Sequence, residues 1–136
     1  MAKFFDEIPQ FLVEWILKQK MFWVASAPLT SDGYVNVSPK GIEGSFHVVS
    51  PTQVWYEDLT GSGMSQAVLH LSLPIDYYVS ELSGVETIAH LRENGRITVL
   101  FNAFDGPPRI ARIFGKGASA YREYVARHGV FRLLKA

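Results

Sequence analysis

The sequence predicts a mainly β (α+β) domain, a barrel or sandwich of short antiparallel strands with flanking helices. Short apolar or alternating segments recur along the chain, and turns rich in Gly and Pro separate them. A length of 136 residues suits one domain with one core. The apolar share of 48% and the charged share of 19% are ordinary for a globular protein. Residues 1–136 are therefore expected to form a single domain.

The first half of the chain predicts a hairpin followed by two short strands. The apolar run 21–29 reads as a buried strand, and residues 31–33, Ser-Asp-Gly, are a turn signal. Residues 34–38 alternate and return antiparallel to the first strand. Pro39 is expected to end this ladder because it has no N–H to donate. The two further strands are expected at 45–49 and 53–57.

The second half predicts another hairpin, formed by residues 96–104 and 109–114 around an Asp-Gly-Pro-Pro turn. Alternation in its second strand should place Ala111 and Ile113 on one face and Ile110 and Phe114 on the other. A last strand could follow at 130–134.

Three segments predict helices. Residues 6–20 carry an apolar face, with Asp6 as a possible cap and Pro9 tolerated in the first turn. Residues 85–94 form a second helix, and Gly95 suits the left-handed position after its end. A short third helix could span 119–128.

Composition excludes several functions. Lys and Arg (13) balance Asp and Glu (13), which gives no reason to expect a nucleic-acid or anionic-membrane partner. There is no Cys, so disulfides and thiolate chemistry are excluded. No His pair has the spacing of a helical metal site, and no metal is expected. The acidic N-terminus does not resemble a secretory signal, and no apolar stretch approaches a membrane span. A cytoplasmic location is the expectation.

Residues 64–84 interrupt the regular pattern. The segment has no Lys or Arg, and it is long for a connection inside a compact domain. One interpretation is a helical insertion or a lid on the surface. The other is a translated intron, because deleting the segment joins Gly63 directly to Val85 and restores a short loop before a helix. A shorter spliced message would distinguish the two.

Residues 36–41, Asn-Val-Ser-Pro-Lys-Gly, are the first motif that could carry chemistry. The motif places the Ser38 hydroxyl, the rigid Pro39, the Lys40 ammonium and the permissive Gly41 near one strand end. Such a group can hold a phosphate or the polar edge of a flavin ring. The alternative interpretation is an ordinary exit from a strand into a loop.

Two weaker motifs follow it. Residues 60–63, Thr-Gly-Ser-Gly, precede the helix start at Thr87 once the segment 64–84 is set aside, and small residues at a helix start can approach an anion. A Gly-rich turn with a capping Thr is the alternative. In the third motif, Trp55 and Tyr56 could pack on a flavin ring, although such aromatics more often belong to the core. The histidines are expected to be structural, with His90 a modest exception one helical turn beyond this loop.

The order of these motifs resembles the pyridoxamine 5′-phosphate oxidase-like family of FMN-binding split barrels. The matching stretches are residues 22–28, 35–41, 54–63, 86–101 and 105–117. The resemblance implies a six-stranded antiparallel split barrel that forms a homodimer with FMN at the subunit interface. The chain has no Arg or Lys in the loop matching the phosphate site, and it stops soon after Gly117, where relatives continue. The barrel is therefore expected to be incomplete at its C-terminus.

The resemblance, carried over residue by residue, and the three motifs together predict nine cofactor contacts. Ser38, Lys40 and Gly41 would touch the isoalloxazine ring or ribityl chain, and Ser62, Gly63 and Thr87 the phosphate. The full set is Ser38, Pro39, Lys40, Gly41, Tyr56, Thr60, Ser62, Gly63 and Thr87. No side chain is assigned as a general acid or base.

The expected function is therefore FMN binding with a flavin-dependent oxidoreductase activity on an unknown small-molecule substrate. Two alternatives stay open: a non-catalytic flavin or small-ligand binding module, and an aberrantly spliced product without binding activity.

Overall fold

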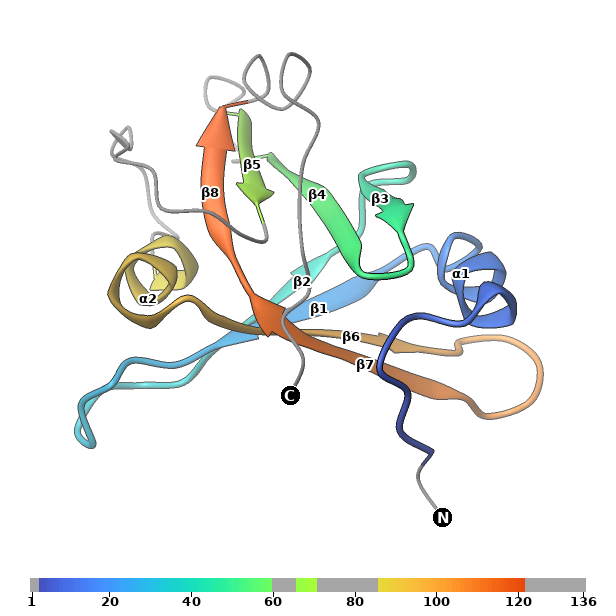
Figure 1. Ribbon diagram of the computed structural model, residues 1–136, viewed down its shortest axis with the longest axis horizontal. Helices are drawn as coiled ribbons and strands as arrows, with labels where there is room; N and C mark the ends of the chain where they lie inside the picture. Colours follow the sequence, from blue (N-terminus) through green and yellow to red (C-terminus); the bar gives the residue numbers. More distant parts are fainter. Residues whose placement is uncertain (1–2, 60–65, 71–85, 122–136) are drawn as a thin grey trace.

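A computed structural model of the protein describes residues 3–59, 66–70 and 86–121. Within these residues, eight strands form two four-stranded antiparallel sheets that cross each other (Figure 1). Sheet A has the strand order β2-β1-β6-β7, and sheet B has the order β3-β4-β5-β8. The bounds are α1 Gln10–Ile16, β1 Phe22–Ser26, β2 Asn36–Lys40, β3 Phe46–Ser50, β4 Gln53–Leu59, β5 Gln66–His70, α2 Glu86–Asn94, β6 Arg96–Asn102, β7 Ile110–Lys116 and β8 Ala118–Tyr121.

The expectation of a mainly β, antiparallel domain with flanking helices is confirmed. The six strands expected from the sequence are present as β1 to β4, β6 and β7, and β5 and β8 extend sheet B. Closure of the sheets into a split barrel stays a prediction. Neither helix of the described residues is long and apolar enough to cross a membrane.

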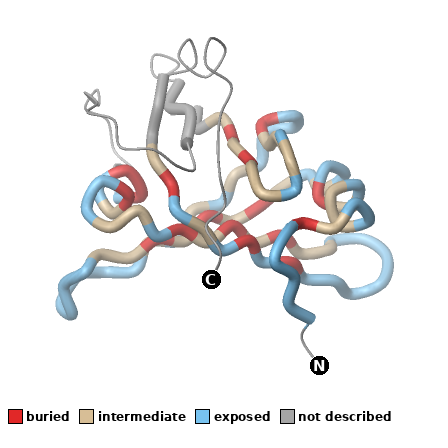
Figure 2. Tube along the Cα trace, in the orientation of Figure 1, coloured by how far each residue is buried: buried red, intermediate tan, exposed pale blue. Residues whose placement is uncertain are grey.

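Sheet A has one face turned toward sheet B and one face turned away. Along β1 the buried residues are Phe22, Val24 and Ser26, and their register partners on β2 are Lys40, Ser38 and Asn36. The same face continues through Val99 on β6 to Ile113 on β7, which are partners of each other. Figure 2 shows this band of buried residues running along sheet A and up into the inner side of α2.

Aromatic rings fill the space between the sheets. The ring of Phe22 lies 5.1 Å from that of Phe46, 5.3 Å from that of Tyr56 and 5.5 Å from that of Phe101, measured between centroids. Phe22, Tyr56 and Phe101 are all at most 3% exposed. Such contacts add about 0.5–1.5 kcal/mol each beyond the burial of area. The core therefore joins β1 and β6 of sheet A to β3 and β4 of sheet B.

The first helix is shorter than the sequence predicts. It begins after Pro9, whose ψ of 150° is extended, and it ends at Ile16. Pro9 thus occupies the N-cap position and no side chain caps the helix, so the expected role of Asp6 is wrong. A residue in the extended region cannot continue a helix backward, which explains the late start.

Strand β2 continues through Pro39 to Lys40, so the prediction that Pro39 ends the ladder is wrong. Pro39 pairs with Trp23, and Lys40 pairs with Phe22. A proline is tolerated here because β2 is an edge strand of sheet A and has one unpaired side.

Two expectations for the less regular segments are corrected. Residues 66–70, inside the segment read as a helical insertion or lid, form strand β5 between β4 and β8. Residues 119–121 belong to strand β8 rather than to a helix. In both places pairing with neighbouring strands determines the strand conformation, and no local sequence pattern predicts that pairing. Whether 64–84 is a translated insert stays a prediction, and the rest of that segment and residues 122–136 lie outside the described residues.

A short stretch holds the end of α2 against β7. Gly95 follows the helix with a φ of 71°, as its sequence position predicts, and its N–H donates to the carbonyl of Leu91. Its own carbonyl accepts from the N–H of Gly117, at 2.7 Å. Gly117 is the residue between β7 and β8, so the helix end lies where the chain passes from sheet A to sheet B.

Candidate functional site

A hydrogen-bonded polar cluster joins β2 to the first turn of α2. The amide of Asn36 donates from Nδ2 to the Thr87 hydroxyl at 2.7 Å. The same nitrogen lies 3.3 Å from Oγ of Ser38, whose hydroxyl can in turn donate to Oδ1 of Asn36 at 3.4 Å. Thr87 is 3% exposed, and Asn36 and Ser38 are half-buried. Ser38 and Thr87, two predicted cofactor contacts, are thus brought together by a third residue that was not assigned a role.

A second polar contact lies beside the first one. Oγ of Ser26 is 3.0 Å from Nδ1 of His90. Ser26 is the register partner of Asn36, and His90 is three residues beyond Thr87, so the two contacts follow the same face of the helix. Ser26 is 5% exposed, and a buried hydroxyl needs such a partner. Together the two contacts dock α2 on the β1–β2 ladder.

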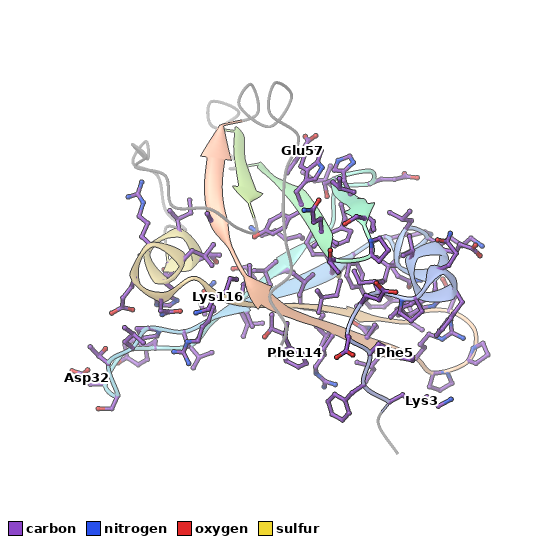
Figure 3. All side chains as sticks on the ribbon, viewed as in Figure 1. Lys3, Phe5, Asp32, Glu57, Phe114 and Lys116 are labelled. Atoms are coloured by element: carbon purple, nitrogen blue, oxygen red, sulfur yellow. The ribbon has the colours of Figure 1, made fainter. Side chains whose placement is uncertain are left out.

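The other end of α2 is fastened to the loop after β1. The Asn94 side chain donates to the carbonyl of Ala27 at 2.8 Å, and Glu93 accepts from the N–H of Leu29 at 2.9 Å. Arg96 donates to the carbonyl of Pro28 at 3.2 Å. These contacts fix the β1–β2 hairpin, which projects at one end of the molecule with Asp32 near its tip (Figure 3). They therefore set the position of β2 relative to the start of the helix.

The remaining predicted residues of β2 divide between the two faces of sheet A. Lys40 is half-buried and lies on the same face as Asn36 and Ser38, which extends the polar row to the end of the strand. Pro39 is exposed on the opposite face. Gly41 follows the strand, and a Cβ built on it would meet only the methyl carbon of Met21, at 3.8 Å. Lys40 and Gly41 thus lie at the open end of the row.

Tyr56 belongs to the core. It is 0% exposed, and its ring packs against that of Phe22. Its contact with the cofactor stays a prediction. Trp55, its neighbour, points to the opposite face of β4 and is stacked on the His47 ring, 3.8 Å between centroids. Glu57 lies on that same outer face, where Figure 3 labels it, with Oε1 3.8 Å from Nε2 of His47.

Three predicted phosphate contacts, Thr60, Ser62 and Gly63, lie outside the described residues. The structure therefore describes the part of the predicted site that lies on β2 and at the start of α2. Sequence reasoning missed Asn36 and Ser26 as partners in the cluster. The motif at 36–41 contains Asn36, but its partner Thr87 is 51 residues away.

The cluster offers hydrogen-bond donors and acceptors on a row that ends in a cation. Hydroxyl and amide groups can bind the carbonyl oxygens of a flavin ring or the oxygens of a phosphate. A lysine adds charge attraction toward an anion. The described residues contain no group of three His, Asp or Glu side chains that could hold a metal ion. The fold and cluster define a mainly β domain with a polar row suited to a polar, anionic ligand.

Comparison with known proteins finds a homologue of the whole chain. The chain is 41% identical to the pyridoxamine 5′-phosphate oxidase family protein ustO of Aspergillus flavus, over 143 aligned positions. The alignment takes in 100% of this chain and 49% of the relative, so the chain spans about half the length of that protein. No family model and no solved structure matches the chain. The chain is thus a homologue of a pyridoxamine 5′-phosphate oxidase family protein, in agreement with the resemblance that the order of its motifs predicts.

Proposed function

We propose that the protein binds FMN along the inner face of β2 and at the start of α2. The observation that supports this most is the Asn36 bridge, because it joins Ser38, which the family resemblance assigns to the ring or ribityl chain, to Thr87, which it assigns to the phosphate. Ser38 and Lys40 suit the polar edge of the ring or the ribityl chain, and Thr87 suits the phosphate. FMN, when bound, supplies electron or hydride transfer, and the chain supplies binding and orientation.

The activity that follows is a flavin-dependent oxidoreductase acting on an unspecified small molecule. Among the described residues of the row, Ser38 and Thr87 carry hydroxyl groups and Lys40 carries a cation. These groups can bind and orient a ligand, so the redox step belongs to the cofactor.

We also propose that the protein forms a homodimer. The outer face of sheet A carries exposed apolar side chains, among them Val37 on β2 and Ile110 and Phe114 on β7, each more than half exposed. Figure 3 shows Phe114 on the side of β7 that is turned away from sheet B. Exposed apolar groups on one flat face favour association. Light scattering across a dilution series tests this proposal, and a monomer at all concentrations would contradict it.

The experiment for cofactor binding is a titration of FMN with the purified chain, following the quenching of flavin fluorescence. Saturable quenching at one flavin per chain supports the proposal. The Lys40→Met variant keeps the length of the side chain and removes the cation, and it should weaken FMN binding about tenfold. The matched variant Lys18→Met, at an exposed lysine beyond α1, should leave binding unchanged. A folded protein that never quenches FMN would refute the proposal.

Redox assays then separate the alternatives. Reduction of the bound flavin by a nicotinamide donor, followed by reoxidation by oxygen, would support an oxidoreductase. A bound flavin that no donor reduces would favour a binding module without catalysis.

A further inference from the structure

The contact between Asn36 and Thr87 has a direction. A hydroxyl carries one proton and can accept up to two hydrogen bonds, whereas the Nδ2 group of asparagine can only donate. Because Nδ2 of Asn36 faces the Thr87 hydroxyl at 2.7 Å, Thr87 is the acceptor in this bond. Its own proton is therefore left to be donated to another group.

The burial of Thr87 makes this direction consequential. The residue is 3% exposed, so bulk water is a poor substitute for a missing hydrogen-bond partner of its hydroxyl. A buried hydroxyl proton without an acceptor costs about 1–3 kcal/mol, and an ionised acceptor forms roughly twice as strong a bond as a neutral one. The hydroxyl held by Asn36 thus favours an anionic oxygen over a neutral group.

We infer that Asn36 is a positioning residue that makes the site select FMN over riboflavin. It fixes Thr87 as a hydrogen-bond donor toward the phosphate, which FMN has and riboflavin lacks. Asn36 need not touch the flavin, since it acts through Thr87. This inference rests on the proposed function and extends it from binding to the discrimination between two flavins.

The neighbouring Ser26–His90 contact supplies an internal comparison. It docks the same helix on the same ladder, and its two residues are the register partner of Asn36 and the residue one turn beyond Thr87. Removing it should loosen the docking of α2 without reversing the Thr87 hydrogen bond. It therefore separates an effect of helix docking from an effect of hydrogen-bond direction.

The test uses the full chain, with FMN and riboflavin as probes in fluorescence titrations. Asn36→Asp replaces the donor by an acceptor, so that the Thr87 proton turns to the new carboxylate. FMN affinity should fall by on the order of 100-fold, and riboflavin affinity by less than about threefold. Ser26→Ala should change both affinities by the same small factor. Thermal unfolding of each variant checks that it is folded.

A negative charge at position 36 could also repel the phosphate directly, and a double-mutant cycle resolves this. In a Thr87→Val background, Asn36→Asp should cost FMN binding less than about tenfold if the residue acts through Thr87. An equal loss in both backgrounds would overturn the inference. Should Asn36→Asp fail to fold, Asn36→Ala removes the donor without adding charge, and a smaller loss confined to FMN is expected.

The outcomes for the two proposals are distinguishable. If the wild-type protein binds neither flavin, the proposed function fails before any variant is compared. If it binds both flavins equally, or if Ser26→Ala shifts the ratio of the two affinities as much as Asn36→Asp does, cofactor binding stands and the role of Asn36 is refuted.

Discussion

The inner face of strand β1 has an apolar end and a polar end that are buried to nearly the same extent. Phe22 and Val24 are 3% and 0% exposed, and Ser26 is 5% exposed. The first two pack among aromatic and aliphatic side chains, whereas Ser26 contacts His90 beside the Asn36–Thr87 bond. The two ends of the strand are therefore equally buried for different reasons, apolar packing at one end and hydrogen bonding at the other.

Burial stabilises the fold at the apolar end of the strand and costs free energy at the polar end. Burying apolar area is favourable by itself, at about 25 cal/mol per Å². Burying a polar group is unfavourable unless a partner is present, and the partner must be held in position. The polar end is thus the part of the face where geometry, rather than hydrophobicity, determines the sequence.

The largest effect is expected at the apolar end. Phe22→Ala removes a ring that contacts Phe46, Tyr56 and Phe101, and it should lower the free energy of unfolding by about 3–5 kcal/mol. Denaturant unfolding measures this. Phe104→Ala, at a residue that is 60% exposed, is the control and should change stability by less than about 1 kcal/mol. Equal losses in the two variants would remove the contrast.

At the polar end, Ser26→Ala should cost about 1–2 kcal/mol of stability, because it leaves His90 without the serine hydroxyl. The measurement is again denaturant unfolding. Ser31→Ala, in the exposed turn of the β1–β2 hairpin, should be close to neutral. A loss at Ser26 as large as that at Phe22 would show that the two ends are equivalent in energy.

The C-terminal end of α2 should show an effect near 1 kcal/mol. Gly95→Ala places a Cβ at a φ of 71°, a strain of roughly 1–2 kcal/mol that the lower entropy of the unfolded alanine chain partly offsets. The built Cβ would also meet Cδ of Lys116 at 3.4 Å. Gly44 has a similar φ of 75° and nothing near its Cβ, so Gly44→Ala isolates the backbone cost. A smaller loss at Gly95 than at Gly44 would contradict the close packing of the helix end.

The smallest effect is expected away from strand β1, at the contact between Arg109 and Trp15. The guanidinium carbon of Arg109 lies 5.4 Å from the centre of the Trp15 ring, and Arg109 is exposed. Arg109→Ala should cost about 0.5 kcal/mol or less, since exposed cation–π contacts are weak. Thermal unfolding with Arg109→Lys as the matched variant measures it. A larger loss would mean that α1 depends on this contact more than its exposure suggests.

Features that depend on neighbouring residues are predicted from the sequence. Helix α2, the left-handed Gly95 after it and the two faces of β7 all follow from local periodicity and a single glycine. Features that depend on distant partners were missed. Strand β5 exists through pairing with β4 and β8, and the helix expected at 119–128 gives way to β8 for the same reason in its described part.

The candidate site follows the same rule. The motif around Ser38 is predicted because it is continuous, and Thr87 is predicted from its place at a helix start and from the family resemblance. The Asn36–Thr87 and Ser26–His90 contacts join residues 51 and 64 positions apart, and nothing in either local sequence announces them. Polar partners across such distances are visible once the sheet register and the helix position are known.

The passage from β7 to β8 has a consequence for how the molecule unfolds. A single residue, Gly117, separates the strand at one edge of sheet A from the strand at one edge of sheet B. Detachment of either edge strand therefore displaces the other one, because a one-residue connection is too short to absorb the movement. Amide protons of the two edge strands should consequently exchange with solvent through one shared opening event rather than two independent ones.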